Sequence, residues 1–168
     1  LLKQRRLRKW YKNFSAKKPP LHFVEHHISH IAGSYYISPY DKAALLSLDG
    51  AGEWSTLFSG IAEGLKIEKF SETMFPHSLG SFYEAATEFC GFRPNYDEGK
   101  TMGLAAYGKR GDAFDFAAGL VTPHPDPQKL LRVQRNAFGF PWGESRLHGD
   151  AFFDALGPAR LADEPLRA

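Results

Sequence analysis

Apolar residues recur in two different periods along the first third of the chain. Ile28, Ile31 and Tyr35 lie three or four residues apart. They predict a helix over residues 26–36, because such positions share one helix face. The apolar run over residues 43–48 instead predicts a short buried strand.

The rest of the pattern predicts further short helices and strands. Helices are expected over residues 3–14, 79–90, 112–120 and 149–156, and strands over residues 21–24, 54–62 and 65–72. The last two strands follow strand 43–48 at short intervals, so the three predict an antiparallel meander. The intervening residues 49–52 are expected to form a tight turn, since Asp-Gly pairs favour turns. Residues 122–127 contain three prolines and are expected to form a linker.

Length and composition predict about one globular domain. The chain has 168 residues, 43% of them hydrophobic and 24% charged. No apolar run is long enough for a membrane span, and no apolar segment follows the first charges as in a signal peptide. A single cysteine, Cys90, precludes an internal disulfide and fits a reducing cytoplasm. The first residue is not methionine, so the chain is expected to be a piece of a longer protein.

Positive charge is concentrated at the start of the chain. Residues 1–18 hold eight of the 21 Lys and Arg residues and no acid, so the remainder carries a net charge of about −6. Nucleic-acid binding is one interpretation of this basic segment. A solvated amphipathic helix is the favoured one, and the acidic remainder is poorly suited to polyanions. We therefore divide the chain into a basic helical segment (1–20), a central part (21–120) and a linker with a partial helical continuation (121–168).

Two histidines and an aspartate form a candidate metal site. His26 and His30 are four residues apart and so lie on one face of the predicted helix, and Asp49 follows an apolar strand. Two imidazoles and a carboxylate suit a divalent metal ion. The zinc-protease pattern is excluded, because His27 stands where that pattern needs the glutamate base. A purely structural role for these histidines stays open.

Glycine-rich segments offer candidate phosphate contacts. Gly50 and Gly52 follow the predicted strand, where backbone N–H groups can approach an anion. Lys100 lies in a Gly-Lys-Thr sequence at a predicted helix start, although Pro94 stands where a Walker A loop needs glycine. An ordinary hairpin turn and a solvated loop are the respective alternatives. His77 and Ser78, which precede Gly80, are further candidates for lining a pocket.

In this order the motifs resemble the O-carbamoyltransferases of natural-product biosynthesis, which include nodulation-factor, cephamycin and aminoglycoside carbamoyltransferases. The matching residues are 25–30, 38–39, 47–54, 75–83 and 99–108. The resemblance extends from about residue 21 to residue 110 and is only loose beyond.

The resemblance implies an α/β fold, a fragment of an actin/Hsp70-like (ribonuclease H-like) ATPase domain related to the tRNA threonylcarbamoyl-transfer proteins, with a mixed sheet that includes the antiparallel meander. It implies that His26, His30 and Asp49 bind a metal, usually Fe(2+). It also implies that a separate C-terminal domain makes carbamoyl-adenylate from carbamoyl phosphate and ATP, and that the carbamoyl group passes to a small-molecule hydroxyl acceptor. The residues expected near the nucleotide are Gly50, Gly52, Gly80, Gly99, Lys100 and Gly103.

The resemblance also implies missing parts. A two-lobed actin-like domain needs far more than 168 residues, and a fourth metal ligand and the adenylating domain are expected beyond this chain. The general base is not identified. A non-catalytic metal- or nucleotide-binding module is the alternative function, and nucleic-acid binding is disfavoured.

Overall fold

The computed structural model describes residues 2–12, 20–139 and 146–165. Its elements are α1 (Leu2–Tyr11), α2 (His26–Tyr35), β1 (Lys42–Gly52), β2 (Ser55–Glu63), β3 (Lys66–Met74), α3 (Leu79–Phe89), α4 (Glu98–Ala105), α5 (Asp112–Leu120), β4 (Val121–Pro123), β5 (Leu131–Val133), η1 (Arg135–Ala137) and α6 (Asp150–Leu156). The helices were predicted to within a few residues. Residues 13 and 14 of the first predicted helix lie outside the described residues.

The predicted meander is confirmed. β1, β2 and β3 form an antiparallel sheet in that order, with Leu48 opposite Leu57 and Phe58 opposite Glu72. Two-residue turns join the strands, and Glu53 in the first of them has a φ of 62°. Short turns enforce antiparallel pairing, because a parallel partner would require a long crossover.

The tight turn predicted at residues 49–52 is wrong. β1 continues to Gly52, and its register with β2 shifts between Leu48 and Gly52. The added residues are accommodated as a bulged strand end, and the chain reverses at Glu53 and Trp54 instead. This irregularity places Asp49 at the point where the regular ladder ends.

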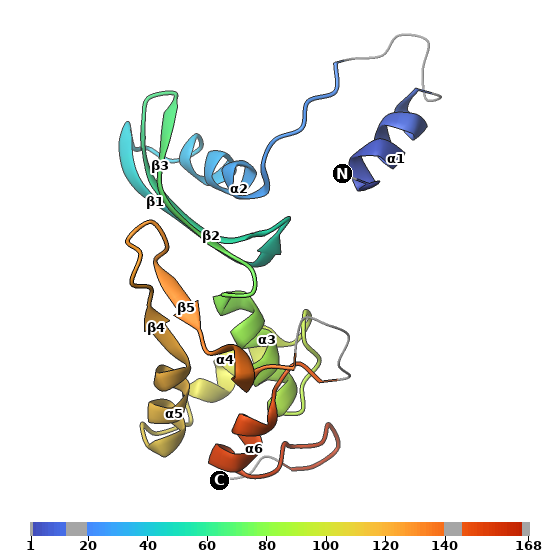
Figure 1. The fold of residues 1–168 in the computed structure, drawn as a ribbon, viewed down its shortest axis with the longest axis vertical. Coiled ribbons are helices and arrows are strands. Elements are labelled where there is room, and N and C mark those ends of the chain that lie inside the picture. Colours follow the sequence, from blue (N-terminus) through green and yellow to red (C-terminus); the bar gives the residue numbers. More distant parts are fainter. Residues whose placement is uncertain (1, 13–19, 140–145, 166–168) are drawn as a thin grey trace.

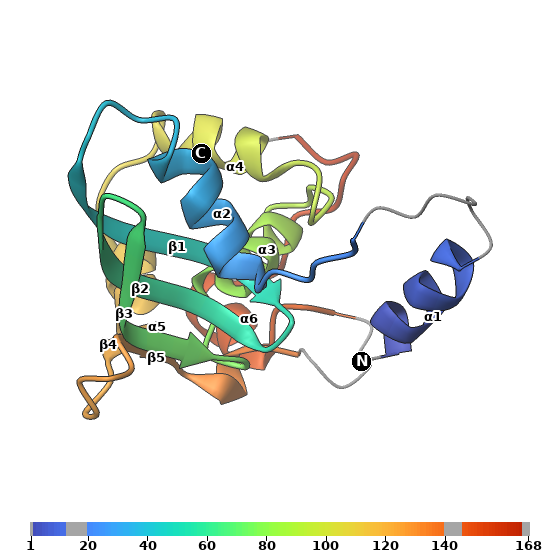
Figure 2. The same ribbon diagram turned by 90° about the horizontal axis from the view of Figure 1, so that it is seen from above.

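Helix α2 covers one face of the sheet (Figures 1 and 2). Its Ile31 and Tyr35 pack with Leu45, Phe58 and Ala62 of β1 and β2 in a buried cluster. Burial of these apolar side chains is the main stabilisation of this layer, at about 1.5–3 kcal/mol for each large one.

A second buried cluster lies below the sheet in Figure 1, where α3, α5, α6 and the β4–β5 hairpin gather. Its members include Ala85, Leu120, Val133 and Phe152. The linker predicted over residues 122–127 is therefore wrong, since Thr122 and Pro123 pair with β5. Proline is tolerated at the end of such a short edge strand. The division of the chain at residue 120 remains a prediction, and this cluster draws on both sides of it.

The strand predicted over residues 21–24 is also wrong. This segment has no regular secondary structure and pairs with no described strand. Phe23 instead lies under the guanidinium of Arg8, 4.8 Å from the ring centroid. Helix α1 lies to the side of the body in Figures 1 and 2, and its apolar residues Leu7 and Trp10 are exposed.

The described part of the chain is thus an α/β arrangement with two antiparallel sheets. The predicted mixed sheet is not found among the described residues, because every strand there is joined to its partner by a hairpin connection. None of the described helices has the length and apolar character to cross a membrane.

Candidate metal centre

Helix α2 begins at the residue that presents the first imidazole. The carboxylate of Glu25 caps the helix and accepts hydrogen bonds from the backbone N–H groups of His27 (3.1 Å) and Ile28 (3.2 Å). Such a cap satisfies donors that lack intrahelical partners. It fixes His26 in the first turn, so His30 follows one turn later on the same face.

The third member of the centre comes from the bulged end of β1. The Asp49 side chain accepts a hydrogen bond from the Gly50 N–H at Oδ1 (2.7 Å) and turns Oδ2 toward α2. Gly52 lets His26 approach this strand, since a Cβ at Gly52 would lie 2.3 Å from Cδ2 of His26. The bulge in β1 and the missing side chain at Gly52 together leave room for the His26 imidazole to pack against the strand.

The three side chains predicted as ligands converge. Nε2 of His26 lies 2.6 Å from Oδ2 of Asp49 and 3.0 Å from Nε2 of His30, and the His30–Asp49 separation is 3.4 Å. Ligand atoms about 2.1 Å from one ion would be about 3.0–3.4 Å apart. Two of the separations match this range, and the third, the His26–Asp49 hydrogen bond, is shorter. The donor set therefore fits a divalent cation, and no other such group of ligands occurs in the described ranges.

The charge state of Asp49 suits the same role. Partial burial by itself would raise the pKa of this carboxyl. The hydrogen bonds from His26 and the Gly50 N–H, with the charges of His26 and His30, outweigh burial and hold the pKa below its ordinary value. Asp49 is therefore ionised at neutral pH, as a metal ligand would need to be.

Ser78 links the end of β1, where Asp49 lies, to α3. It caps that helix by accepting a hydrogen bond from the Ser81 N–H (3.0 Å), and its hydroxyl lies 3.0 and 2.7 Å from the carbonyl oxygens of Asp49 and Gly50. Gly80 permits the close approach, since a Cβ there would lie 2.4 Å from the Gly50 nitrogen. The sequence predicted Ser78 only as a residue that lines a pocket, and nothing in the sequence indicated its contact with β1.

Glu84 of α3 is a further acidic group beside the centre. A Cβ built on Gly50 would lie 3.1 Å from Oε1 of Glu84. Burial first, and then the negative charges of Glu98 and Asp49, raise the pKa of Glu84. The i, i+4 spacing of Gly80 and Glu84 puts both on one helix face but gives no sign of the contact with β1. The position of Glu84 against the strand follows from the helix–strand contact.

The predicted nucleotide contacts fall into two groups. Gly50, Gly52 and Gly80 lie around Asp49, where each allows a close approach of neighbouring atoms. Gly99, Lys100 and Gly103 lie on α4, which packs against α3. The Lys100 ammonium there pairs with Asp97 at 2.8 Å, and a Cβ at either α4 glycine would meet open space. The surface around Gly99 and Gly103 is thus less crowded than the surface around Gly50, Gly52 and Gly80.

His27, between His26 and His30 in the sequence, faces the sheet. Its ring is fully buried, and Nδ1 lies 2.7 Å from Oγ of Ser47 on β1. This residue anchors α2 to the sheet and so positions both neighbouring imidazoles.

Comparison with known proteins assigns the surrounding region to one family. The carbamoyltransferase N-terminus family matches residues 5–119, which include all three converging side chains. An uncharacterized protein of Synechocystis, sll1178, is 48% identical over 91 residues, which are 54% of this chain and 15% of that protein. An uncharacterized protein of Methanocaldococcus jannaschii, MJ1051, is 36% identical over 85 residues, 51% of this chain and 16% of its own length.

The nodulation protein NolNO of Sinorhizobium fredii is 30% identical over 86 residues, 51% of this chain and 12% of that protein. The aligned region thus spans about one sixth or less of each of these relatives.

Proposed function

Because the chain belongs to the carbamoyltransferase N-terminus family, we propose that it is the metal-holding part of an O-carbamoyltransferase. The reaction transfers a carbamoyl group from carbamoyl-adenylate to a hydroxyl of a small molecule in natural-product or glycan biosynthesis. The convergence of His26, His30 and Asp49 carries this proposal, since it brings three suitable ligands together inside the family-matched region.

These three side chains would hold Fe(2+) or another divalent ion. When bound, such an ion polarises a carbonyl or phosphoryl oxygen. The protein keeps Asp49 ionised, and Ser78 and Gly80 hold its strand against α3. The ligand atoms are thus oriented before the substrate arrives, which limits reorganisation during the reaction.

The nucleotide part of carbamoyl-adenylate is assigned to the neighbouring glycines. Gly50 and Gly80 leave no Cβ atoms between the strand and α3, and Gly52 leaves none between the strand and His26 of α2. Gly99, Lys100 and Gly103 offer an accessible helix surface with one ammonium group. A phosphate bound there would compete with the Asp97 carboxylate for the Lys100 ammonium. Phosphate oxygens form charge-assisted hydrogen bonds strong enough to replace that ion pair. The general base remains unassigned.

The proposed partners lie outside this chain. The carbamoyl-adenylate would come from an adenylating domain that uses carbamoyl phosphate and ATP, and the acceptor is a small alcohol. A cytoplasmic location follows from that metabolism.

A non-catalytic metal- or nucleotide-binding module is the second candidate. Close packing at Gly52 and Gly80 favours this second candidate. A side chain at either position would clash with neighbouring protein atoms, so the need for glycine there is explained without a bound nucleotide.

The decisive experiment has two stages. First, metal content is measured in purified protein and in a His26→Ala variant, where loss of the bound ion is expected. The control is His22→Ala, outside the cluster. Second, the protein is supplied with carbamoyl phosphate, ATP, an adenylating partner and a panel of alcohols, and release of AMP and carbamate ester is followed. Metal binding without product supports the module, and unchanged metal content in His26→Ala rejects the site.

A further inference from the structure

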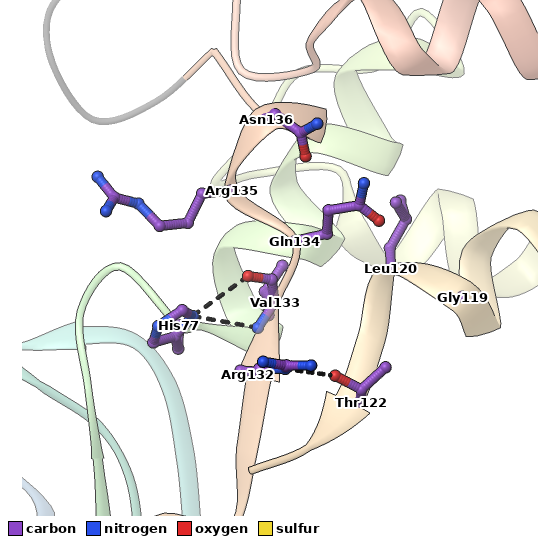
Figure 3. Close-up of a pocket in the computed structure, with 9 residues that line it drawn as sticks. All are labelled: His77, Gly119, Leu120, Thr122, Arg132, Val133, Gln134, Arg135 and Asn136. Atoms are coloured by element: carbon purple, nitrogen blue, oxygen red, sulfur yellow. Dashed lines mark hydrogen bonds between the residues drawn. The ribbon is translucent and has the colours of Figure 1, made fainter. Parts of the chain in front are cut away.

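A second hollow lies beside the β4–β5 hairpin, apart from the metal centre. It has a volume of about 520 Å³, in the range of small-molecule sites. Figure 3 shows its walls, which come from the end of α5, from β5 and the turn after it, and from His77 before α3. Most of these residues follow residue 119, where the family match ends.

The lining of this hollow is positively charged. It includes Arg132 and Arg135 and the amides of Gln134 and Asn136, and no acidic residue of the described part of the chain lines it. Within the described segments neither guanidinium forms an ion pair. Unpaired arginines beside amide donors are suited to bind phosphate or carboxylate oxygens.

Arg132 is held in place while most of its donors stay free. Its Nε donates a hydrogen bond to Oγ1 of Thr122 on the paired strand, at 3.1 Å. Figure 3 shows the side chain lying toward Thr122, with Arg135 extending from the following turn. A guanidinium fixed at Nε keeps four terminal N–H groups for a ligand.

His77 adds a third group to the same wall. Its Nδ1 lies 3.2 Å from both the nitrogen and the carbonyl oxygen of Val133. In the tautomer whose Nδ1 accepts the hydrogen bond from the Val133 N–H, the ring hydrogen of neutral His77 is on Nε2. Nε2 is then a hydrogen-bond donor. Burial is the main cause that lowers the pKa of His77; the hydrogen bond with Val133 opposes it, and the positive charges of His124, Arg135 and Arg132 add to the lowering.

The end of α5 opposes this charge only weakly. A helix carboxyl end carries about half a negative charge. Here the Leu120 carbonyl already accepts a hydrogen bond from the Gln134 N–H, at 2.8 Å. Two full positive charges therefore dominate the hollow.

We propose that the hollow between α5, β5 and His77 is a binding site for a phosphate-bearing small molecule, with Arg132 and Arg135 as its positively charged lining residues. The site is independent of the proposed metal centre. The hollow and the proposed metal centre are linked by two consecutive residues. His77 lines the hollow, and Ser78 contacts Asp49 on β1. A nucleotide and a free phosphomonoester share the phosphoryl group that this lining recognises.

The test is a titration of metal-free protein, in the presence of a chelator, with inorganic phosphate, AMP and adenosine at low ionic strength. Phosphate and AMP are expected to bind and adenosine is not. Tighter binding of AMP than of phosphate would identify a nucleotide as the ligand, and equal binding would identify a simple phosphomonoester.

Arg132→Gln and Arg135→Gln are each expected to weaken phosphate binding about tenfold. Arg110→Gln is the matched control, because Arg110 is exposed and stacks on Phe114 away from the hollow. Both pocket arginines are exposed, so thermal melts should show folded variants. Equal weakening by Arg110→Gln, or binding that disappears with the chelator, would overturn the proposal.

Discussion

The imidazole of His26 rests directly on Gly52, with no space for even a methyl group between them. A Cβ at Gly52 would meet three atoms of His26 at 2.3–2.9 Å. The glycine at the end of β1 thus sets the position of the imidazole that bridges Asp49 and His30.

Gly52→Ala should therefore displace His26 and weaken metal binding at least tenfold while the protein stays folded. Gly33→Ala is the matched control, since Gly33 lies on α2 with open space at its Cβ position. That change should leave metal affinity intact and raise helix stability by up to about 1 kcal/mol. Competition with a metal-binding dye measures both affinities. Wild-type affinity in Gly52→Ala would show that His26 is not a ligand.

Ser78→Ala should destabilise the protein and loosen the metal site together. The hydroxyl is fully buried, caps α3 and contacts the carbonyls of Asp49 and Gly50. Loss of a helix cap costs about 1 kcal/mol, and the buried polar groups left unpaired add about 1–3 kcal/mol. Denaturant unfolding measures the change. Ser34→Ala removes only an exposed hydroxyl bonded within α2 and should change stability by less than about 0.5 kcal/mol.

Glu88 should be the main anchor of the segment before α6. Its Oε2 accepts hydrogen bonds from the backbone nitrogens of Leu147 (2.7 Å) and His148 (3.2 Å), and lies 2.6 Å from Nδ1 of His148. Glu88→Ala should lower the free energy of unfolding by about 2–3 kcal/mol, since charged hydrogen bonds are the strong ones. Asp150→Ala, which breaks only the exposed pair with Arg146, should cost at most about 1 kcal/mol. Equal losses in the two variants would contradict the anchor role.

Local patterns predicted the helices and the meander because each depends on neighbours in sequence. The same holds for His26 and His30, whose alignment follows from helical spacing alone. Asp49 was predicted as a candidate ligand from its chemistry. The structure brings it beside His26 and His30 through a bulge in β1, and no sequence pattern predicts that bulge. The turn predicted at Asp49–Gly52 failed because tertiary contacts with α2 and α3 use those glycines for close approach.

The hairpin that replaces the predicted linker depends on long-range packing, which composition does not reveal. Prolines at 123, 125 and 127 indicate a linker, but Val121 and Val133 pair because both pack against the cluster around Phe152. Arg132 and Arg135 meet His77 only through this pairing, so the sequence gives no local signal for their hollow.

Glu84 supplies the pH-dependent prediction. Burial and the nearby charges of Glu98 and Asp49 raise its pKa above the ordinary glutamate value of 4.5. The folded protein therefore binds this proton more tightly than the unfolded chain, so ionisation of Glu84 lowers stability as the pH rises above about 4.5. Glu84→Gln should stabilise the metal-free protein at neutral pH, and the gain should vanish as the pH falls below that value. Unfolding curves across this range measure it, with the exposed Glu53→Gln as control. A gain that persists at low pH would mean that the effect comes from packing and not from the charge.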